Sequence, residues 1–163
     1  MNAHDVLIYG QLTLQGALDG VPEGTWERPG VCGPWSVKDI VAHLASYELV
    51  LVDVIGSLVG VGPTPCLDRF RALGPSFNDA EVDSRGDMNV AAVVAELNAA
   101  HARTLTLIGS VPPGTARQSG TLPWYGDPYS LDDLIVYLAY GHKRQHTAQI
   151  AAFADLEPTE PAS

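Results

Sequence analysis

Four stretches of the chain carry apolar residues at helical spacing, and segments rich in proline and glycine separate them. We expect helices over residues 3–18, 36–60, 89–109 and 130–155. No stretch alternates apolar and polar residues as a strand would, and no internal repeat is present. Four long helices in one chain predict an all-α fold with the architecture of a four-helix bundle.

Two of these helices open with the same start signal. Ser36 and Ser130 are good N-cap residues, and Asp39 and Asp133 follow each of them three positions later. This spacing allows a capping box, in which the serine and the aspartate satisfy each other's backbone N–H groups. Capping is therefore a sufficient explanation for Asp39, and no catalytic role is needed for it.

The connection between the second and third helices is long for a compact domain. Residues 60–88 are polar and rich in glycine and proline, and a short helix over Leu67–Leu73 is the one regular element expected there. We expect this segment to cross over one end of the bundle. Residues 1–156 then form a single domain, and residues 157–163 form a frayed tail.

Composition excludes several classes of protein. Hydrophobic residues make up 46% of the chain and charged residues 17%, which indicates a globular domain rather than a disordered one. With 19 acidic and 9 basic residues, a formal charge of -10 and no basic run, a nucleic-acid partner is not expected. The longest apolar run, residues 49–61, is too short and too interrupted to span a bilayer.

The expected location is a reducing cytoplasm. Cys32 and Cys66 lie in predicted loops and belong to no CxxC or Cys–His motif, and two cysteines do not make a disulfide scaffold. The first ten residues lack the basic region that begins a signal peptide.

The last helix carries two histidines four residues apart, His142 and His146. Residues at this spacing lie on one helical face, and here that face is the apolar one. Polar groups in a core need partners, so the pair either binds a divalent metal or forms hydrogen bonds within the core. Lys143 and Arg144 lie off the apolar stripe and are expected on a solvated face.

His43 is the candidate for a third ligand. It lies in the second helix, at the margin of the apolar stripe, from where it can face a neighbouring helix. Taken alone it is better explained as a surface or hydrogen-bonded residue. Three neutral imidazoles from two helices, however, form a known catalytic ligand set that leaves coordination positions open.

Two segments together resemble a known family. The segment WSVKDIVAHLASYE (residues 35–48) has the pattern W-[ST]-x-x-[DE]-x-x-x-H, and YGHKRQHTAQI (residues 140–150) has the pattern H-x-x-x-H-x-x-Q. Both patterns, in this order, resemble the DinB/YfiT-like superfamily of bacterial four-helix proteins. The resemblance implies a bundle with its long crossover between helices 2 and 3. It also implies a divalent metal, zinc or nickel, on His43, His142 and His146.

Members of that superfamily differ in activity. Some resemble thiol S-transferases that use bacillithiol, mycothiol or glutathione, including a mycothiol-dependent maleylpyruvate isomerase, and others are hydrolases that open a strained ring on a genotoxin. We therefore expect a metal-dependent enzyme that acts on a small electrophile, with a low-molecular-weight thiol as co-substrate. The alternatives are a metal-dependent or metal-independent hydrolase of the self-protection type and a non-catalytic metal-binding bundle linked to stress. No motif in the chain names the substrate or the thiol.

Further residues are candidates for roles near such a site. Glu48 falls inside the apolar face of the second helix, where it could act as a general base, orient a ligand histidine, or reach out to the rim. His101 is expected to be a satisfied core histidine, with a fourth ligand or a substrate contact as the alternative, and Gln149 is expected to be a hydrogen-bonding group near His146. Trp124 and Tyr125 either line the mouth of a pocket or seal the core. Pairing of helical faces in a homodimer is compatible with the sequence but not indicated by it.

Overall fold

The computed structural model describes residues 2–157. The tail predicted for residues 157–163 lies outside this range from residue 158 onwards. Glu157, the last described residue, forms an ion pair with Arg28.

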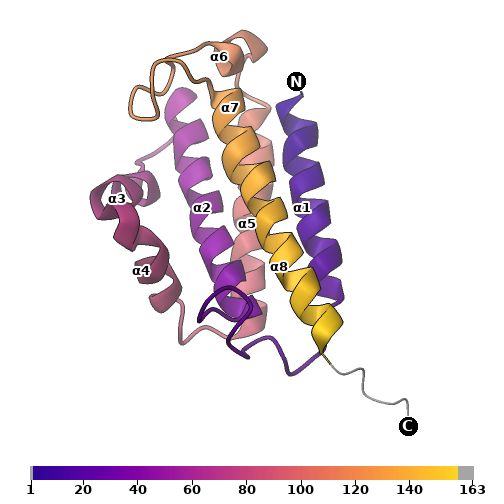
Figure 1. The fold of residues 1–163 in the computed structure, drawn as a ribbon. Helices are drawn as coiled ribbons and strands as arrows, with labels where there is room; N and C mark the ends of the chain where they lie inside the picture. Colours follow the sequence, from indigo (N-terminus) through magenta and orange to yellow (C-terminus); the bar gives the residue numbers. More distant parts are fainter. Residues whose placement is uncertain (1, 158–163) are drawn as a thin grey trace.

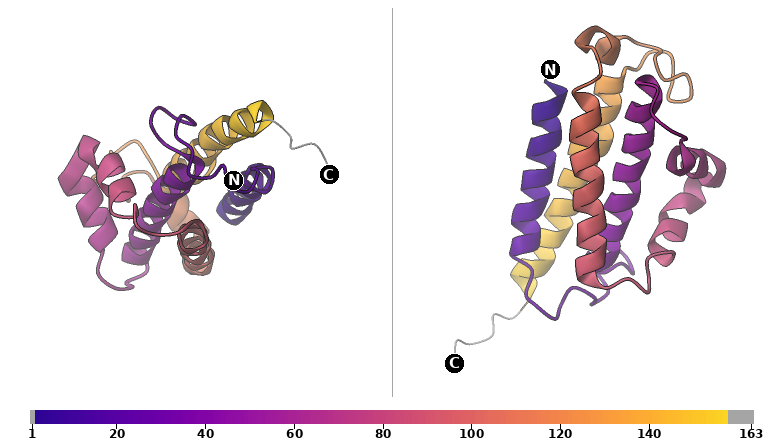
Figure 2. Two further views of the ribbon diagram at one scale, coloured as in Figure 1. Left: turned by 90° about the horizontal axis from the view of Figure 1, so that it is seen from below. Right: turned by 180° about the vertical axis from the view of Figure 1, so that it is seen from behind.

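Long helices lie side by side along most of the described chain (Figure 1, Figure 2). They are α1 (Ala3–Asp19), α2 (Val37–Leu58), α5 (Val90–Ile108) and a last rod made of α7 (Leu131–Ile135), η2 (Val136–Gly141) and α8 (His142–Leu156). Residues 2–157 contain no strand, only one isolated bridge between Cys32 and Trp35. The all-α prediction is confirmed.

Both predicted capping boxes are present. The backbone N–H of Asp39 donates to Ser36 Oγ (3.2 Å), and the backbone N–H of Ser36 donates to Asp39 Oδ2 (2.9 Å). Ser130 and Asp133 make the same pair of bonds at the start of α7. These bonds satisfy backbone donors that have no partner inside the helix, so both helices begin where the sequence predicts.

The crossover between α2 and α5 is more helical than expected. It contains α3 (Pro65–Leu73), η1 (Gly74–Ser76) and α4 (Phe77–Asp83), where the sequence indicated one short helix in a loop. Asp53 Oδ2 caps α3 from outside by accepting the backbone N–H groups of Cys66 (2.6 Å) and Leu67 (3.0 Å). Phe77, 1% exposed, anchors the start of α4 in the core. As a result α3 and α4 flank α2 along its side (Figure 1), and the expectation that this segment crosses over one end of the bundle is wrong.

The connection between α5 and α7 spans residues 109–130 and contains the short helix α6 (Pro113–Arg117). Its backbone is tied to the start of the last rod by a bond from the N–H of Gly120 to the carbonyl of Tyr129 (2.9 Å). The segment therefore covers one end of the four long helices, beside the start of α7 (Figure 1).

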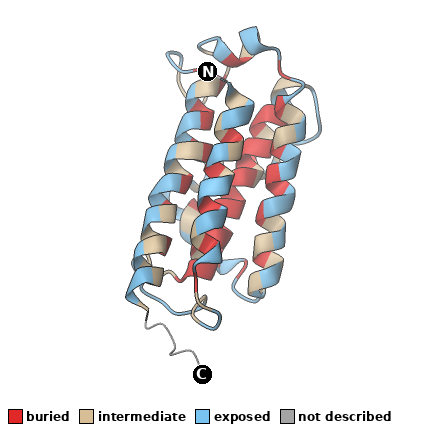
Figure 3. Cartoon of the chain, turned by 90° about the vertical axis from the view of Figure 1, so that its right-hand side faces the viewer, coloured by how far each residue is buried: buried red, intermediate tan, exposed pale blue. Residues whose placement is uncertain are grey.

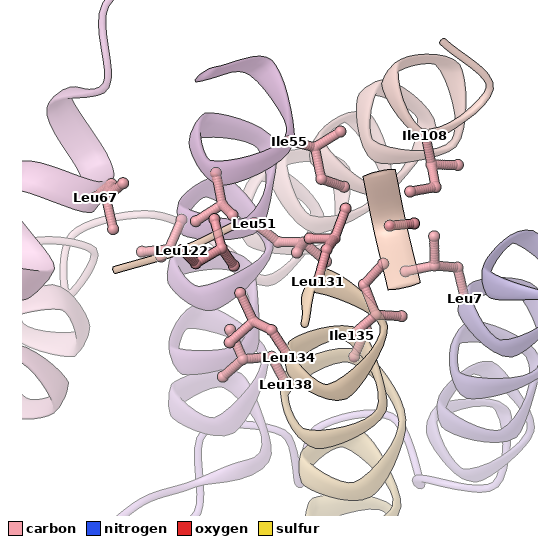
Figure 4. Packing of buried hydrophobic residues seen from close by; sticks show 14 of the residues in the cluster. Leu7, Leu51, Ile55, Leu67, Ile108, Leu122, Leu131, Leu134, Ile135 and Leu138 are labelled. Atoms are coloured by element: carbon pink, nitrogen blue, oxygen red, sulfur yellow. The ribbon is translucent and has the colours of Figure 1, made fainter. Parts of the chain in front are cut away.

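Buried residues line the inward faces of the long helices (Figure 3). Leu7 of α1, Ile55 of α2, Ile108 of α5 and Ile135 of α7 meet in one cluster (Figure 4). Among the described helices, α2 has a length and composition that would allow a membrane crossing, but 78% of its apolar window is buried inside the fold. Such burial is typical of the central helix of a globular domain.

The last rod is not a uniform α-helix. Its η2 segment is a π-helical turn, which inserts one residue relative to regular α spacing. Leu138 and Lys143, five residues apart, therefore both point inward, and Lys143 is 1% exposed. The prediction that Lys143 is solvated is wrong, because it assumed an unbroken period of 3.6 residues. Arg144 is exposed as predicted.

Candidate metal centre

The three candidate histidines meet between α2 and α8. His43 Nε2 lies 2.8 Å from His142 Nε2, which lies 3.1 Å from His146 Nε2. One ring nitrogen from each residue lies within 4.8 Å of the other two. The four-residue spacing brings His142 and His146 together on α8, and the packing of α8 near α2 adds His43.

Aromatic rings hold these imidazoles in place. The His43 ring lies between Trp35 and Tyr47, with ring centroids 4.9 Å away in each case. Tyr47 also packs edge-on against His142 (4.8 Å), and its hydroxyl donates to Asn78 Oδ1 of α4 (2.9 Å). Since tightly packed rings have few alternative rotamers, the three Nε2 atoms are pre-positioned.

The environment keeps the three imidazoles neutral. Burial, followed by the neighbouring His142 and His146, lowers the pKa of His43 from 6.5 to about 3. Burial, then His146 and Lys143, lowers the pKa of His142 to about 4. Burial also lowers the pKa of His146, against an opposing hydrogen bond with Gln149. Neutral imidazoles present the lone pairs that metal ions require.

Hydrogen bonding within the chain leaves this cluster only partly satisfied. His146 Nδ1 donates to Gln149 Oε1 (2.8 Å), which confirms the predicted hydrogen-bonding role of Gln149 and leaves the Nε2 lone pair free. The Nδ1 atoms of His43 and His142 are buried without a hydrogen-bond partner in the described part of the chain. Three neutral rings cannot pair all their nitrogens with one another, whereas one divalent ion accepts three Nε2 lone pairs at once.

The spacing of these nitrogens also suits a metal. Ligands at roughly 2.0–2.1 Å from a tetrahedral zinc ion lie about 3.3 Å from each other. The separations of 2.8 and 3.1 Å are close to that value. The residues therefore fit a divalent metal, and a small outward shift of the rings would complete the geometry.

Glu48 lies outside the histidine cluster. It is 2% exposed, its Oε1 lies 3.2 Å from His101 Nδ1, and its Oε2 lies 2.7 Å from Lys143 Nζ. Lys143 also donates to Gln11 Oε1 of α1 (2.8 Å). The structure thus confirms His101 as a satisfied core histidine. Among the described residues, Lys143, which follows His142 in the chain, links Glu48 to the cluster.

The pKa of Glu48 reflects these partners. Burial alone raises the pKa, but the hydrogen bond with His101 and the charge and hydrogen bond of Lys143 outweigh it and lower the pKa to about 2. The carboxylate is therefore ionised and held by two donors at neutral pH. A role for Glu48 in acid–base chemistry stays a prediction.

A cavity of about 620 Å³ reaches the cluster at His142. Trp124 and Tyr125 line it, as the sequence reading allowed. That reading missed Tyr47, Phe70 and Arg71, which line it as well. Tyr47 could have been found, because it lies one helical turn after His43 on the same face. Phe70 and Arg71 belong to the crossover, whose position no local pattern predicts.

Comparison with known protein families matches residues 10–150 to the DinB superfamily. The matched range includes all three histidines, the crossover and most of the long helices. No curated protein and no solved structure matches the chain significantly.

Proposed function

We propose that this chain, which belongs to the DinB superfamily, is a metal-dependent enzyme that acts on a small electrophile in the manner of a thiol S-transferase. One observation carries the proposal: three neutral imidazoles, those of His43 and His146 buried and that of His142 half-buried, converge where a cavity meets His142. A purely structural metal site is closed on all sides by protein ligands, whereas three ligands beside a cavity leave room for a reactant.

His43, His142 and His146 would hold the metal, zinc or nickel. A divalent ion on three neutral imidazoles keeps its positive charge and supplies a Lewis acid that favours a thiolate or hydroxide at neutral pH. The chain's own residues prepare this site. Gln149 fixes the tautomer of His146 by accepting its Nδ1–H, and Trp35 and Tyr47 restrain the ring of His43.

In this proposal Glu48 acts as a positioning group rather than as a base. Both of its oxygens already have partners, and a carboxylate with a pKa of about 2 is a poor proton acceptor at neutral pH. By holding Lys143, it fixes the first turn of α8, which carries His142.

Hydrolysis is the second candidate reaction. The cavity is lined mainly by aromatic and aliphatic side chains. Such a lining suits an apolar electrophile but offers few polar groups for a sugar-linked thiol such as mycothiol or bacillithiol. Water would then replace the thiol as the nucleophile, with the same three histidines in use.

The first experiment concerns the metal. Protein stripped with a chelator and reloaded with zinc or nickel should take up one ion per chain, measured by atomic emission. His43→Ala and His142→Ala should lose most of this uptake, and His4→Ala, an exposed histidine on α1, should retain it. A wild type without stoichiometric metal would overturn the metal site and leave hydrogen-bonded core histidines in its place.

The second experiment concerns the reaction. Chlorodinitrobenzene is offered with glutathione, mycothiol, bacillithiol or no thiol, with and without reloaded metal. Metal-dependent consumption that requires a thiol supports the transferase, and metal-dependent consumption without a thiol supports the hydrolase. Stoichiometric metal with no turnover of chlorodinitrobenzene under any of these conditions would favour a non-catalytic metal-binding bundle.

We place the protein in a reducing cytoplasm, which suits its free Cys32 and Cys66, and assign it no nucleic-acid or membrane partner. A homodimer stays compatible with this proposal, and sedimentation of the metal-loaded protein would decide it.

A further inference from the structure

The cavity beside the histidine cluster combines an aromatic lining with one positive charge. We propose that it binds a small ligand with a flat apolar body and a single carboxylate, and that Arg71 is the residue that selects the carboxylate. This inference rests on the proposed function, because it describes the substrate class of the same site.

The apolar body of the proposed ligand is inferred from the side chains that line the cavity. Phe70 packs against Tyr47 (ring centroids 5.7 Å apart) and Trp124 (6.3 Å), and Trp124 packs against Tyr125 (5.8 Å). All four rings line the cavity. Aromatic faces and edges bind flat apolar groups with favourable geometry. A volume of about 620 Å³ is typical of a small-molecule site.

The carboxylate of the proposed ligand is inferred from the presence of Arg71 at the cavity. It is the one charged side chain among the described residues that line this cavity. Two other arginines, Arg69 and Arg85, are bound to Glu81 at 2.6 and 2.8 Å, but Arg71 has no ion pair within residues 2–157. A guanidinium group matches a carboxylate with two parallel hydrogen bonds. The chain as a whole carries a net charge of -10. An arginine without an ion pair at this apolar cavity therefore gives the cavity a local positive charge, which favours an anionic ligand.

The arginine that would bind the carboxylate and the histidine cluster lie on different walls of the cavity. Arg71 lies on α3 of the crossover, whereas His142 begins α8, and α2 with Tyr47 lies between these elements (Figure 1). A ligand whose carboxylate is bound by Arg71 can therefore direct its other end toward the three histidines. The crossover, which no local pattern predicted, would then set the substrate class.

The test measures binding to metal-free protein, so that no bound metal ion contributes to the attraction. Phenylbutyrate and its neutral amide, phenylbutyramide, are titrated by calorimetry and by ligand-observed NMR. Arg71 is exposed, so wild type should prefer the acid by roughly tenfold, which is the low end for a hydrogen bond to a charged group. Arg71→Gln should bind both compounds alike, with the amide's affinity unchanged within about twofold. Arg103→Gln, which removes an exposed arginine on α5 outside this cavity, should keep the preference.

Any other pattern overturns the inference. It is wrong if wild type binds the amide as well as the acid, if Arg71→Gln keeps the preference, or if wild type saturates with neither compound. If Arg103→Gln also loses the preference for the acid, that preference comes from the overall charge of the protein and not from Arg71. These outcomes are separate from the metal and turnover experiments, because binding is measured without metal and without reaction.

Discussion

Lys143 Nζ lies 2.7 Å from Glu48 Oε2, and both side chains are only 2% exposed. This ion pair joins α2 to the first turn of α8, next to His142. Its geometry depends on the π-helical turn before α8, which directs Lys143 inward. A buried pair of this kind is costly to break from one side, since the remaining charge stays in a medium of low polarity.

Lys143→Met should therefore destabilise the metal-free protein by about 3–5 kcal/mol, because it leaves Glu48 with His101 as its remaining partner. The double variant Lys143→Met with Glu48→Gln should recover a large part of that loss. Urea unfolding measures both. Arg144→Met, the exposed neighbour, should stay within about 0.5 kcal/mol of wild type. If Lys143→Met and Arg144→Met lower the free energy of unfolding by the same amount, the ion pair between Lys143 and Glu48 contributes nothing to stability.

Acid should destabilise the metal-free protein well above the range in which carboxylates titrate. The folded pKa of His43 is about 3 and that of His142 about 4, against an ordinary value of 6.5, so the unfolded chain binds more protons between these limits. The free energy of unfolding then falls as pH falls from 6.5, by about 1.4 kcal/mol per pH unit for each extra proton.

The measurement is a set of urea titrations between about pH 6 and 5. His43→Gln should show a shallower dependence on pH than wild type, since it removes one of the three histidines whose pKa values are lowered by folding. A wild-type stability that is flat across this interval would contradict the assigned pKa values.

Gly10 sits where α1 touches the π-helical turn. A Cβ atom at this position would collide with the carbonyl oxygen of Ala139, which is backbone and cannot move aside cheaply. Gly10→Ala should lower the free energy of unfolding by about 1–3 kcal/mol, although alanine favours helix.

The matched control is Gly16→Ala on the same helix, where nothing lies within 4 Å of the added atom. It should stabilise the protein by about 0.4–1 kcal/mol. Thermal unfolding of the two variants should move in opposite directions, and a stabilised Gly10→Ala would mean that the two helices are not in close contact.

Gln149 should matter for metal affinity without being a ligand. Gln149→Leu removes the acceptor that holds the proton on His146 Nδ1, so the lone pair of Nε2 is no longer fixed toward the cluster. Zinc affinity should fall by roughly 10–100-fold, as for other partners of ligand histidines. Gln149→Glu keeps an acceptor at this position and should retain the affinity. Competition with a fluorescent chelator measures the zinc affinity of both variants. If Gln149→Leu binds zinc as tightly as wild type, Gln149 does not support the ligand His146.

Local sequence signals were enough to predict the all-α fold and its helix starts. Ser36 with Asp39, and Ser130 with Asp133, form bonds within one turn, so their effect depends only on residues nearby. The pairing of His142 with His146 follows for the same reason, from a spacing of four on a helix. His43 was a candidate from its place at the margin of the apolar stripe, but only the family pattern joined it to the other two histidines, since spacing along the chain cannot relate residues on different helices.

Tertiary structure alone decided the rest. The π-helical turn forms where α1 approaches at Gly10, and with it Lys143 turns from the predicted surface into the core beside Glu48. The position of Arg71 depends on how α3 packs on α2, with Asp53 capping α3 from outside. These features arise from contacts between segments far apart in the chain, whose energies are set by packing and by the burial of charge, and neither is visible in a local pattern of residues.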